Sequence, residues 1–198
     1  DHHDHQFYGL GLVLRTDRFL GNRNLDIQDY FYGSVTDGRC NESSAGRVYI
    51  SYPNDLINSY FLYHALDEQF NPEIGFARNV GIKNYIWFTT LSPRPNLPFI
   101  KKLVIKPFNF NYTTDMEGTL QFRDIEIRPF GFITNSDDEF LFNINNDYDY
   151  VWETDFKIYG NIVPSKVYNN WFYKAEYHGN RKRAVSFDLK TRWGDFYN

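Results

Sequence analysis

Alternation of apolar and polar residues predicts short β-strands along the whole chain. Clusters of Asn, Asp, Gly and Pro separate the alternating segments, as expected for turns. The expected strands are residues 7–14, 29–35, 47–52, 56–66, 84–91, 100–110, 119–127, 140–144, 151–159, 166–177 and 184–191. No amphipathic helix of three turns is expected. The pattern therefore predicts an all-β fold, an antiparallel sandwich or barrel-like structure.

Two segments need local arguments. Residues 56–66 are apolar enough for a buried strand or a short helix, and a strand is favoured because Tyr60, Phe61 and Tyr63 are poor helix formers. Residues 92–98 contain three prolines, which lack the N–H that a strand needs, so a loop is expected there. Aromatics are 20% of the chain, with 19 Phe and 16 Tyr, and this composition also favours sheet.

An internal repeat suggests two related β units. Residues 17–26 and 138–147 share six of ten aligned positions without a gap, and each copy follows an aromatic-glycine pair. A second echo is Arg47-Val48-Tyr49 against Lys166-Val167-Tyr168. Self-similarity of this kind is typical of duplicated units. We therefore expect one unit at 1–128 and a shorter one at 129–198, within one compact body.

Short motifs in the first half resemble a known family. They are Thr16-Asp17-Arg18-Phe19-Leu20, Val48-Tyr49-Ile50-Ser51-Tyr52-Pro53, Ala65-Leu66-Asp67-Glu68-Gln69-Phe70-Asn71, and residues 85–91 and 99–105 around Ser92-Pro93-Arg94. Over about residues 7–108 they resemble the insect multiprotein bridging factor 2 family, also described as salivary secreted peptides. The family's Gly-Gly pairs are mostly absent here, and a Pro-rich loop replaces its Gly-containing turn. The resemblance implies an insect origin, a removed signal peptide and an all-β fold.

Charge and hydropathy argue against two classes of partner. The formal net charge is −4, whereas nucleic-acid binding usually requires a basic excess. The one dense basic run, Arg181-Lys182-Arg183, is interpreted as a solvated turn. No stretch approaches the roughly 18 apolar residues of a membrane-spanning helix. We expect neither a nucleic-acid partner nor a membrane span.

Several features favour a secreted glycoprotein. The chain opens without Met, which fits removal of a signal peptide or a shortened chain. Asn41-Glu42-Ser43 and Asn111-Tyr112-Thr113 are glycosylation acceptors beside turn-like residues. The single cysteine, Cys40, cannot form an internal disulfide and lies in a polar stretch expected to be a loop. It is either an inert thiol or a thiol that pairs with another chain.

The N-terminus is a candidate metal site. A free amine followed by a histidine at position three can offer four nitrogens in a square plane, the geometry that Cu(II) and Ni(II) prefer. Asp1, His2 and His3 fit this arrangement if Asp1 is the true terminus, and His5 could add a ligand. A terminal tail without function is the alternative. No other cofactor is expected.

Signatures of catalysis are missing. No His-Glu-x-x-His, paired Cys-x-x-Cys or Gly-x-Ser-x-Gly occurs. His64 lies among apolar residues and is interpreted as a core histidine, and His178 precedes a turn. The acidic and amide-rich stretch 137–149 could offer oxygen ligands to Ca²⁺, but it lacks the glycine and closing glutamate of the EF-hand and is interpreted as a solvated face or turn. The protein is not expected to be an enzyme.

The tryptophans are the remaining candidate binding residues. They are Trp87, Trp152, Trp171 and Trp193, accompanied by many tyrosines. Flat aromatics can anchor a protein interface, stack on sugars or line a site for a hydrophobic ligand, and packing within the core is the alternative. We expect a secreted, oligomeric protein that packs with itself or with another secreted protein. Binding of a small hydrophobic ligand or a glycan is the second hypothesis.

Overall fold

The computed structural model describes residues 5–36, 39–70, 80–150, 156–158 and 161–196. This part of the chain contains strands and no helix. The strands are β1 (His5–Phe19), β2 (Arg23–Thr36), β3 (Arg39–Pro53), β4 (Ile57–Leu66), β5 (Ile82–Leu91), β6 (Ile100–Leu103), β7 (Lys106–Asp115), β8 (Leu120–Thr134), β9 (Glu139–Tyr150), β10 (Phe156–Ile158), β11 (Asn161–Val163), β12 (Val167–His178) and β13 (Asp188–Gly194).

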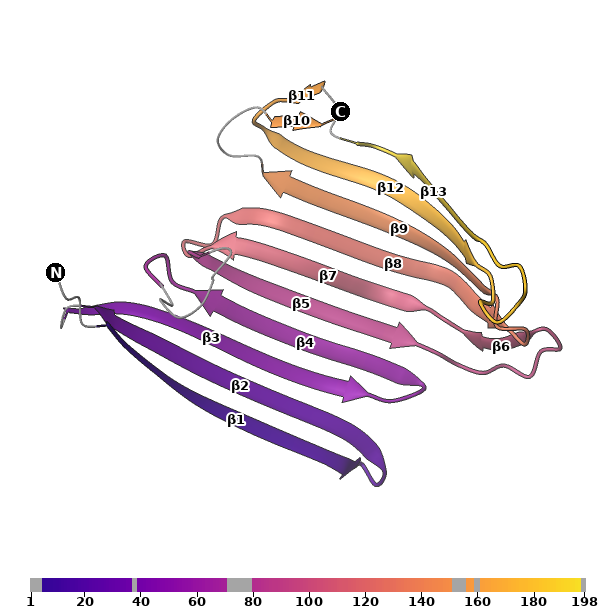
Figure 1. The fold of residues 1–198 in the computed structure, drawn as a ribbon, viewed down its shortest axis with the longest axis horizontal. Helices are drawn as coiled ribbons and strands as arrows, with labels where there is room; N and C mark the ends of the chain where they lie inside the picture. The colour runs from indigo at the N-terminus through magenta and orange to yellow at the C-terminus, as the bar shows by residue number, and fades with distance from the viewer. Residues whose placement is uncertain (1–4, 37–38, 71–79, 151–155, 159–160, 197–198) are drawn as a thin grey trace. The chain divides into compact units, whose positions relative to one another are not determined.

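The predicted all-β antiparallel class is confirmed. Eleven strands form one sheet in the order β1-β2-β3-β4-β5-β7-β8-β9-β12-β13, with β6 paired to β8 (Figure 1). β10 and β11 form a separate hairpin. The order is not closed: among the described residues, β1 and β13 each pair with one strand. Residues 56–66 form a strand, as predicted.

Most strands are longer than the alternation predicted. β3 begins at Arg39 and therefore includes Cys40, which was expected in a loop. Polar residues can extend this strand because Ser43 of β3 pairs with Ser34 of β2 through a hydroxyl–hydroxyl hydrogen bond of 2.6 Å. The expected strand at 100–110 divides into β6 and β7 around Val104, whose N–H donates to the carbonyl of Gly131.

The chain divides into two compact units. Unit 1 comprises residues 1–54, 59–87 and 112–120, and unit 2 comprises residues 55–58, 88–111 and 121–198. A boundary at 128 and 129, as expected from the repeat, falls inside β8. The two repeat segments also differ in conformation: residues 17–26 contain the β1–β2 turn, whereas most of 138–147 lies in β9.

In unit 1, glycines and tyrosines pack as complementary pairs across β1 and β2. A side chain at Gly9 would meet the Tyr32 ring at 2.5 Å, and one at Gly11 would meet the Tyr30 ring at 2.9 Å. On the opposite face, the Tyr8 ring occupies the space above Gly33. These rings therefore cover backbone that a larger residue would displace, and they hold β1 against β2.

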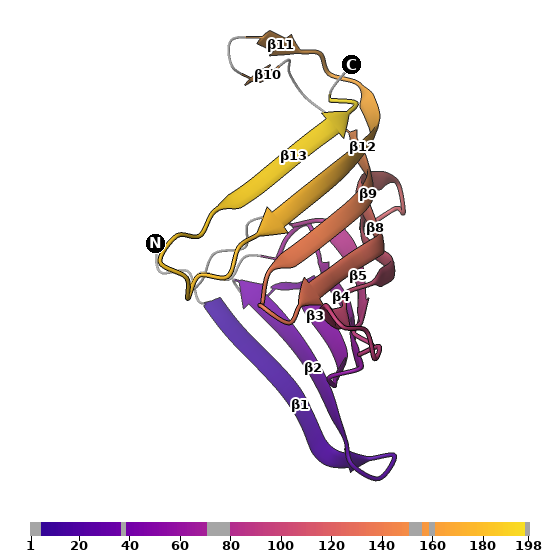
Figure 2. The ribbon, with the colours of Figure 1, turned by 90° about the vertical axis from the view of Figure 1, so that its right-hand side faces the viewer.

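In unit 2, β8, β9, β12 and β13 lie side by side (Figure 2). Successive side chains of a strand point to opposite faces. One face holds most of the Asn, Asp, Lys and Arg residues, and the other holds most of the aromatic residues, although Asn146 lies beside Trp171 on the aromatic side. The stretch 137–149 was expected to be a solvated face or turn. For the part within β9 this expectation is wrong: Asn143 is 1% exposed and Asn146 is also buried. Their amides hydrogen-bond to neighbouring side chains, which makes burial possible.

Candidate interaction surfaces

The aromatic face of unit 2 is a candidate interaction surface. Its members alternate along four strands, so they emerge on one side of the sheet. We define the aromatic face as Phe130, Phe132, Phe140, Phe142, Trp171, Tyr173, Tyr177, Leu189 and Trp193, together with the neighbouring Phe187.

Ring contacts connect these residues across the strands. Phe140 stacks on Phe132 with centroids 5.0 Å apart and meets Tyr177 at 4.9 Å. Tyr177 in turn contacts Phe187 at 5.0 Å. A second group joins Phe142, Tyr173 and Trp193, with Tyr173 and Trp193 stacked at 5.8 Å. Each such pair contributes about 0.5–1.5 kcal/mol beyond its burial, so the rings are held in place.

The aromatic face remains open to solvent. Trp171 is 49% exposed, Trp193 is 46% exposed and Phe187 is 62% exposed. Single exposed apolar residues are ordinary on protein surfaces, but contiguous groups of this kind mark interaction sites. Because the rings are already ordered by each other, a partner that binds them loses little side-chain entropy.

The opposite face of unit 2 is covered by its own charged side chains. Arg128 donates from Nε to Oδ1 of the buried Asn143 at 2.7 Å. The guanidinium of Arg192 lies 3.6 Å from the centroid of Phe172, which is only 2% exposed. Lys106 and Glu126 form an ion pair of 2.6 Å. The charged side chains of the polar face therefore find contacts within unit 2.

Two carboxylates face each other within the polar face. Asp124 and Asp147 are directly paired across β8 and β9. Burial raises the pKa of Asp147 to about 6, and the charge of Asp124 adds to the effect while Arg192 and Lys174 oppose it. Burial also raises the pKa of Asp124, followed in size by the charge of Glu126. Each carboxylate of the pair therefore holds a proton at a higher pH than an exposed aspartate does.

Unit 1 carries a second apolar surface. We define its aliphatic face by apolar residues in the cross-strand rows of β1, β2 and β3: Tyr8, Leu10, Leu12, Leu14, Ile27, Phe31, Val48 and Ile50. The charged Asp29 lies in the same rows, between Leu12 and Val48. Leu10 is the most exposed of them at 78%. The other face of these strands holds Tyr30, Tyr32 and Tyr49. Unit 1, like unit 2, therefore has one face that is more apolar and one face that is more polar.

The predicted tryptophans have different positions. Trp171 and Trp193 both lie on the aromatic face. Trp87 is exposed on β5 in unit 1 and contacts Phe61 with ring centroids 6.3 Å apart. Trp152 lies outside the described residues. Alternation identified Trp171 within a strand, but the phenylalanines that surround it could be assigned to its face only from the strand register.

The two histidines belong to different units. His64 is part-buried in β4, and burial followed by the charge of Arg47 lowers its pKa. His178 ends β12, where its Nε2 lies 3.2 Å from Glu176 and its Nδ1 lies 3.3 Å from Asp188. The two carboxylates hold the imidazole in the β12–β13 ladder, an arrangement that pairs the strands.

The predicted metal, thiol and glycosylation residues are described only in part. Asp1, His2 and His3 lie outside the described residues, and His5 begins β1. Among the residues that the structure describes, no group of three or more His, Cys, Asp or Glu side chains could hold a metal ion. Cys40 and Asn41 lie in β3 and Asn111 lies within β7, so neither acceptor asparagine occupies a turn. Their modification stays a prediction.

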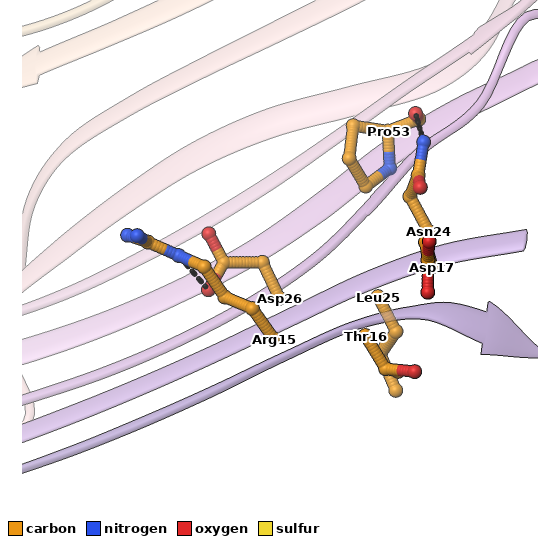
Figure 3. Close-up of a pocket in the computed structure, with 7 residues that line it drawn as sticks. All are labelled: Arg15, Thr16, Asp17, Asn24, Leu25, Asp26 and Pro53. Atoms are coloured by element: carbon orange, nitrogen blue, oxygen red, sulfur yellow. Dashed lines mark hydrogen bonds and ion pairs between the residues drawn. The ribbon is translucent and has the colours of Figure 1, made fainter.

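A shallow pocket of about 430 Å³ lies at the β1–β2 hairpin in unit 1 (Figure 3). Arg15 and Asp26 form an ion pair of 3.3 Å at one side of it. At the other side, the backbone N–H of Asn24 donates to the side chain of Asn54. These groups satisfy each other, and the pocket contains neither of the predicted histidines. The pocket therefore gives no support to catalysis.

Comparisons with known proteins add no relative. No family profile, curated protein or solved structure matches the chain. In the described part of the chain, no helix has the length and apolar character needed to cross a membrane. The resemblance to the insect multiprotein bridging factor 2 family stays a prediction.

Proposed function

We propose that this protein is a non-enzymatic structural or assembly protein that packs with itself or with partner proteins through aromatic and aliphatic sheet faces. The observation that carries the proposal is the contrast within unit 2. Its polar face is closed by Arg128, Lys106 and Arg192, whereas the aromatic face is ordered and open. A surface of this kind gains most from burial against another apolar surface.

The magnitude favours a macromolecular partner. Full burial of a large apolar side chain contributes about 1.5–3 kcal/mol, so a half-exposed one can still gain roughly 1 kcal/mol. Seven members of the aromatic face are between 37% and 63% exposed: Phe130, Phe140, Trp171, Tyr173, Phe187, Leu189 and Trp193. Their joint gain of about 7 kcal/mol is within the roughly 4–15 kcal/mol cost of association. A partner that contributes an equal apolar surface would raise the gain to about 14 kcal/mol, near the upper end of that cost.

The test is the mass in solution of protein from its natural source, measured by native mass spectrometry and sedimentation velocity. We expect masses at multiples of the chain. The double variant Trp171→Gln/Trp193→Gln should weaken this assembly at least tenfold. The matched control is Trp87→Gln, which changes an equally exposed tryptophan outside the aromatic face. A wild-type protein that is monomeric at all concentrations, without a bound protein, would refute the proposal.

A second function is supported by the aliphatic face of unit 1. Leu10, Leu12 and Leu14 form a row of exposed hydrocarbon along β1, which suits an acyl chain or another small hydrophobic ligand. The exposed tryptophans would suit a glycan in the same way. A monomer that carries extra small-molecule mass in the native spectrum would favour this function over assembly.

Secretion is part of the proposal. It is supported by the two acceptor triplets at Asn41 and Asn111 and by the resemblance to salivary secreted peptides. The protein would then work in an extracellular setting, where Cys40 could pair with a second chain. Glycosidase treatment of the natural protein followed by mass measurement tests occupancy of each site.

A further inference from the structure

The two end strands of the sheet differ in how they are protected. β13 has Asp188, Lys190 and Arg192 within seven residues. β1 has no aspartate, glutamate, lysine or arginine from His5 to Leu14, and its first such residue is Arg15. Native proteins guard an open strand edge with charges, prolines or bulges, because its unpaired N–H and C=O groups recruit other strands. Only β13 has such charges along its length.

β1 is also regular enough to serve as a template. Its register with β2 runs without a shift from His5 to Thr16, and the irregularity comes only between Thr16 and Phe19. From Gln6 to Thr16 the side chains of this run are exposed, and Leu10 is the most exposed of its large apolar residues. Such an edge presents straight backbone, apolar side chains and no bulge, which is the surface that strand addition uses.

We propose that β1 pairs in an antiparallel manner with β1 of a second copy, about a two-fold axis at Leu10. This inference rests on the proposed assembly function. It adds that the partner is a second copy of the chain and that the contact is made by the free edge of β1. Antiparallel pairing of two copies extends both faces of unit 1, so that the aliphatic faces of the copies become continuous.

The register follows from the two glycines of β1. With Leu10 on the axis, Gly9 faces Gly11 of the second copy, Tyr8 faces Leu12 and Phe7 faces Val13. Shifting the axis to Gly9 would place Phe7 opposite Gly11, and shifting it to Gly11 would place Val13 opposite Gly9. The space above each glycine is already filled by a tyrosine ring from β2, so a large side chain opposite would collide with that ring.

Charge also permits this pairing. The paired span from His5 to Arg15 contains no Asp, Glu or Lys, and its single Arg is Arg15 at the end. Its guanidinium is already paired with Asp26 of β2 at 3.3 Å. In the proposed register Arg15 faces His5 of the second copy, and a histidine is largely neutral at about pH 8. No two like charges oppose each other across the new edge.

A cysteine placed on the axis tests the proposal. In a Cys40→Ser background, Leu10→Cys brings two thiols opposite each other at a Cα separation of about 4.5–5.5 Å, within the range of a disulfide. The matched control is Leu14→Cys on the same exposed face. Its two copies would lie about 27 Å apart, because eight residues at roughly 3.4 Å separate them.

We expect a covalent dimer of Leu10→Cys on a non-reducing gel, formed at least tenfold faster than that of Leu14→Cys at pH 8. Mixing Tyr8→Cys and Leu12→Cys proteins should give the mixed dimer in preference to either pure dimer. Equal rates at positions 10 and 14, or a faster rate at 14, would overturn the register and the proposal.

The edge is tested separately by Leu10→Lys, which sets two ammonium groups face to face on the axis. Leu10 is exposed, so the circular dichroism spectrum should be unchanged, while the dimer dissociation constant measured by sedimentation velocity should rise at least tenfold.

If Leu10→Lys has no effect and Trp171→Gln/Trp193→Gln dissociates the assembly, the edge proposal fails and the assembly function stands. A wild-type monomer free of partners would refute both. An edge occupied by a peptide of another protein would overturn the choice of a second copy.

Discussion

Replacement of Asp147 by asparagine should stabilise the protein at neutral pH. Asp147 and Asp124 oppose each other across β8 and β9, and burial holds the pKa of Asp147 at about 6. At pH 7.5 Asp147 is charged in the folded state, opposite Asp124 and in surroundings that penalise charge. The amide introduced by Asp147→Asn is neutral and can donate to Asp124 in place of the proton that Asp147 carries at lower pH.

The sign and the magnitude follow from the pKa. An acid whose pKa is raised by folding binds more protons in the folded state, so its contribution makes the protein less stable as pH rises from about 4 to about 6. A change of about two pH units corresponds to at most ~3 kcal/mol. The Asp147 side chain is only part-buried, so solvent screening reduces the effect to about 1–2 kcal/mol. For a chain of this size that is roughly 2–8 °C in Tm.

The assay is urea denaturation and thermal unfolding of both proteins between pH 4 and pH 8. The variant should gain stability at pH 7.5 and lose that advantage at pH 4, where Asp147 is already protonated in the folded wild-type protein. Asp29→Asn, at an exposed position on β2, is the matched control and should change stability by less than about 0.5 kcal/mol at every pH. A destabilised Asp147→Asn protein at pH 7.5, or a gain independent of pH, would refute the raised pKa of Asp147.

Three further outcomes can be measured. Gly131→Ala should lower the free energy of unfolding by about 2–3 kcal/mol, because the new Cβ would lie 2.5 Å from the carbonyl oxygen of Val104. In the control Gly46→Ala the new Cβ meets nothing closer than 3.9 Å, and the loss should be less than about 1 kcal/mol. Equal losses in chemical denaturation would contradict the packing at Gly131. The pKa of His64 measured by NMR should lie below 6.5. Because folding lowers this pKa, the contribution of His64 to stability should be lost as pH falls through 6.5. A measured pKa above 6.5 would contradict the burial of His64. Asp138→Ala should lower Tm and reduce stability most above about pH 4, because hydrogen bonds from the backbone N–H of Asn180 and from Arg183 lower the pKa of this carboxyl; unchanged unfolding would show that the turn contacts do not matter.

Alternation predicted the class of the fold well and the ends of its strands poorly. It placed strand character in each segment from 7–14 to 84–91 because apolar and polar residues exchange faces there. It missed the extensions in which both faces are polar, such as the start of β3, because a serine pair can replace apolar contacts when it is hydrogen-bonded and buried. Local pattern carries no information about such long-range pairs.

The candidate surfaces were predictable only in part. Trp171 and Trp193 stand out as single large aromatics, and the structure places both on the aromatic face. The clustering of Phe140 and Phe142 with them depends on the register of β9 against β12, which no local sequence signal specifies. The Asn and Asp residues of β9 misled the prediction for the same reason: opposite Arg128 and Asn170 they are buried partners, whereas in isolation they suggest a wet turn.

The asymmetry of unit 2 constrains how the protein can associate. Covering the polar face would take Arg128, Lys106 and Glu126 further from water, at a cost of several kcal/mol for each ion that gains no new partner. Covering the aromatic face removes apolar area and leaves every one of those ion pairs hydrated as before. The aspartate pair adds to this difference, because a partner over Asp124 and Asp147 would raise their pKa values further. If the protein associates as proposed, this difference favours the aromatic face over the charged face as the contact surface of unit 2.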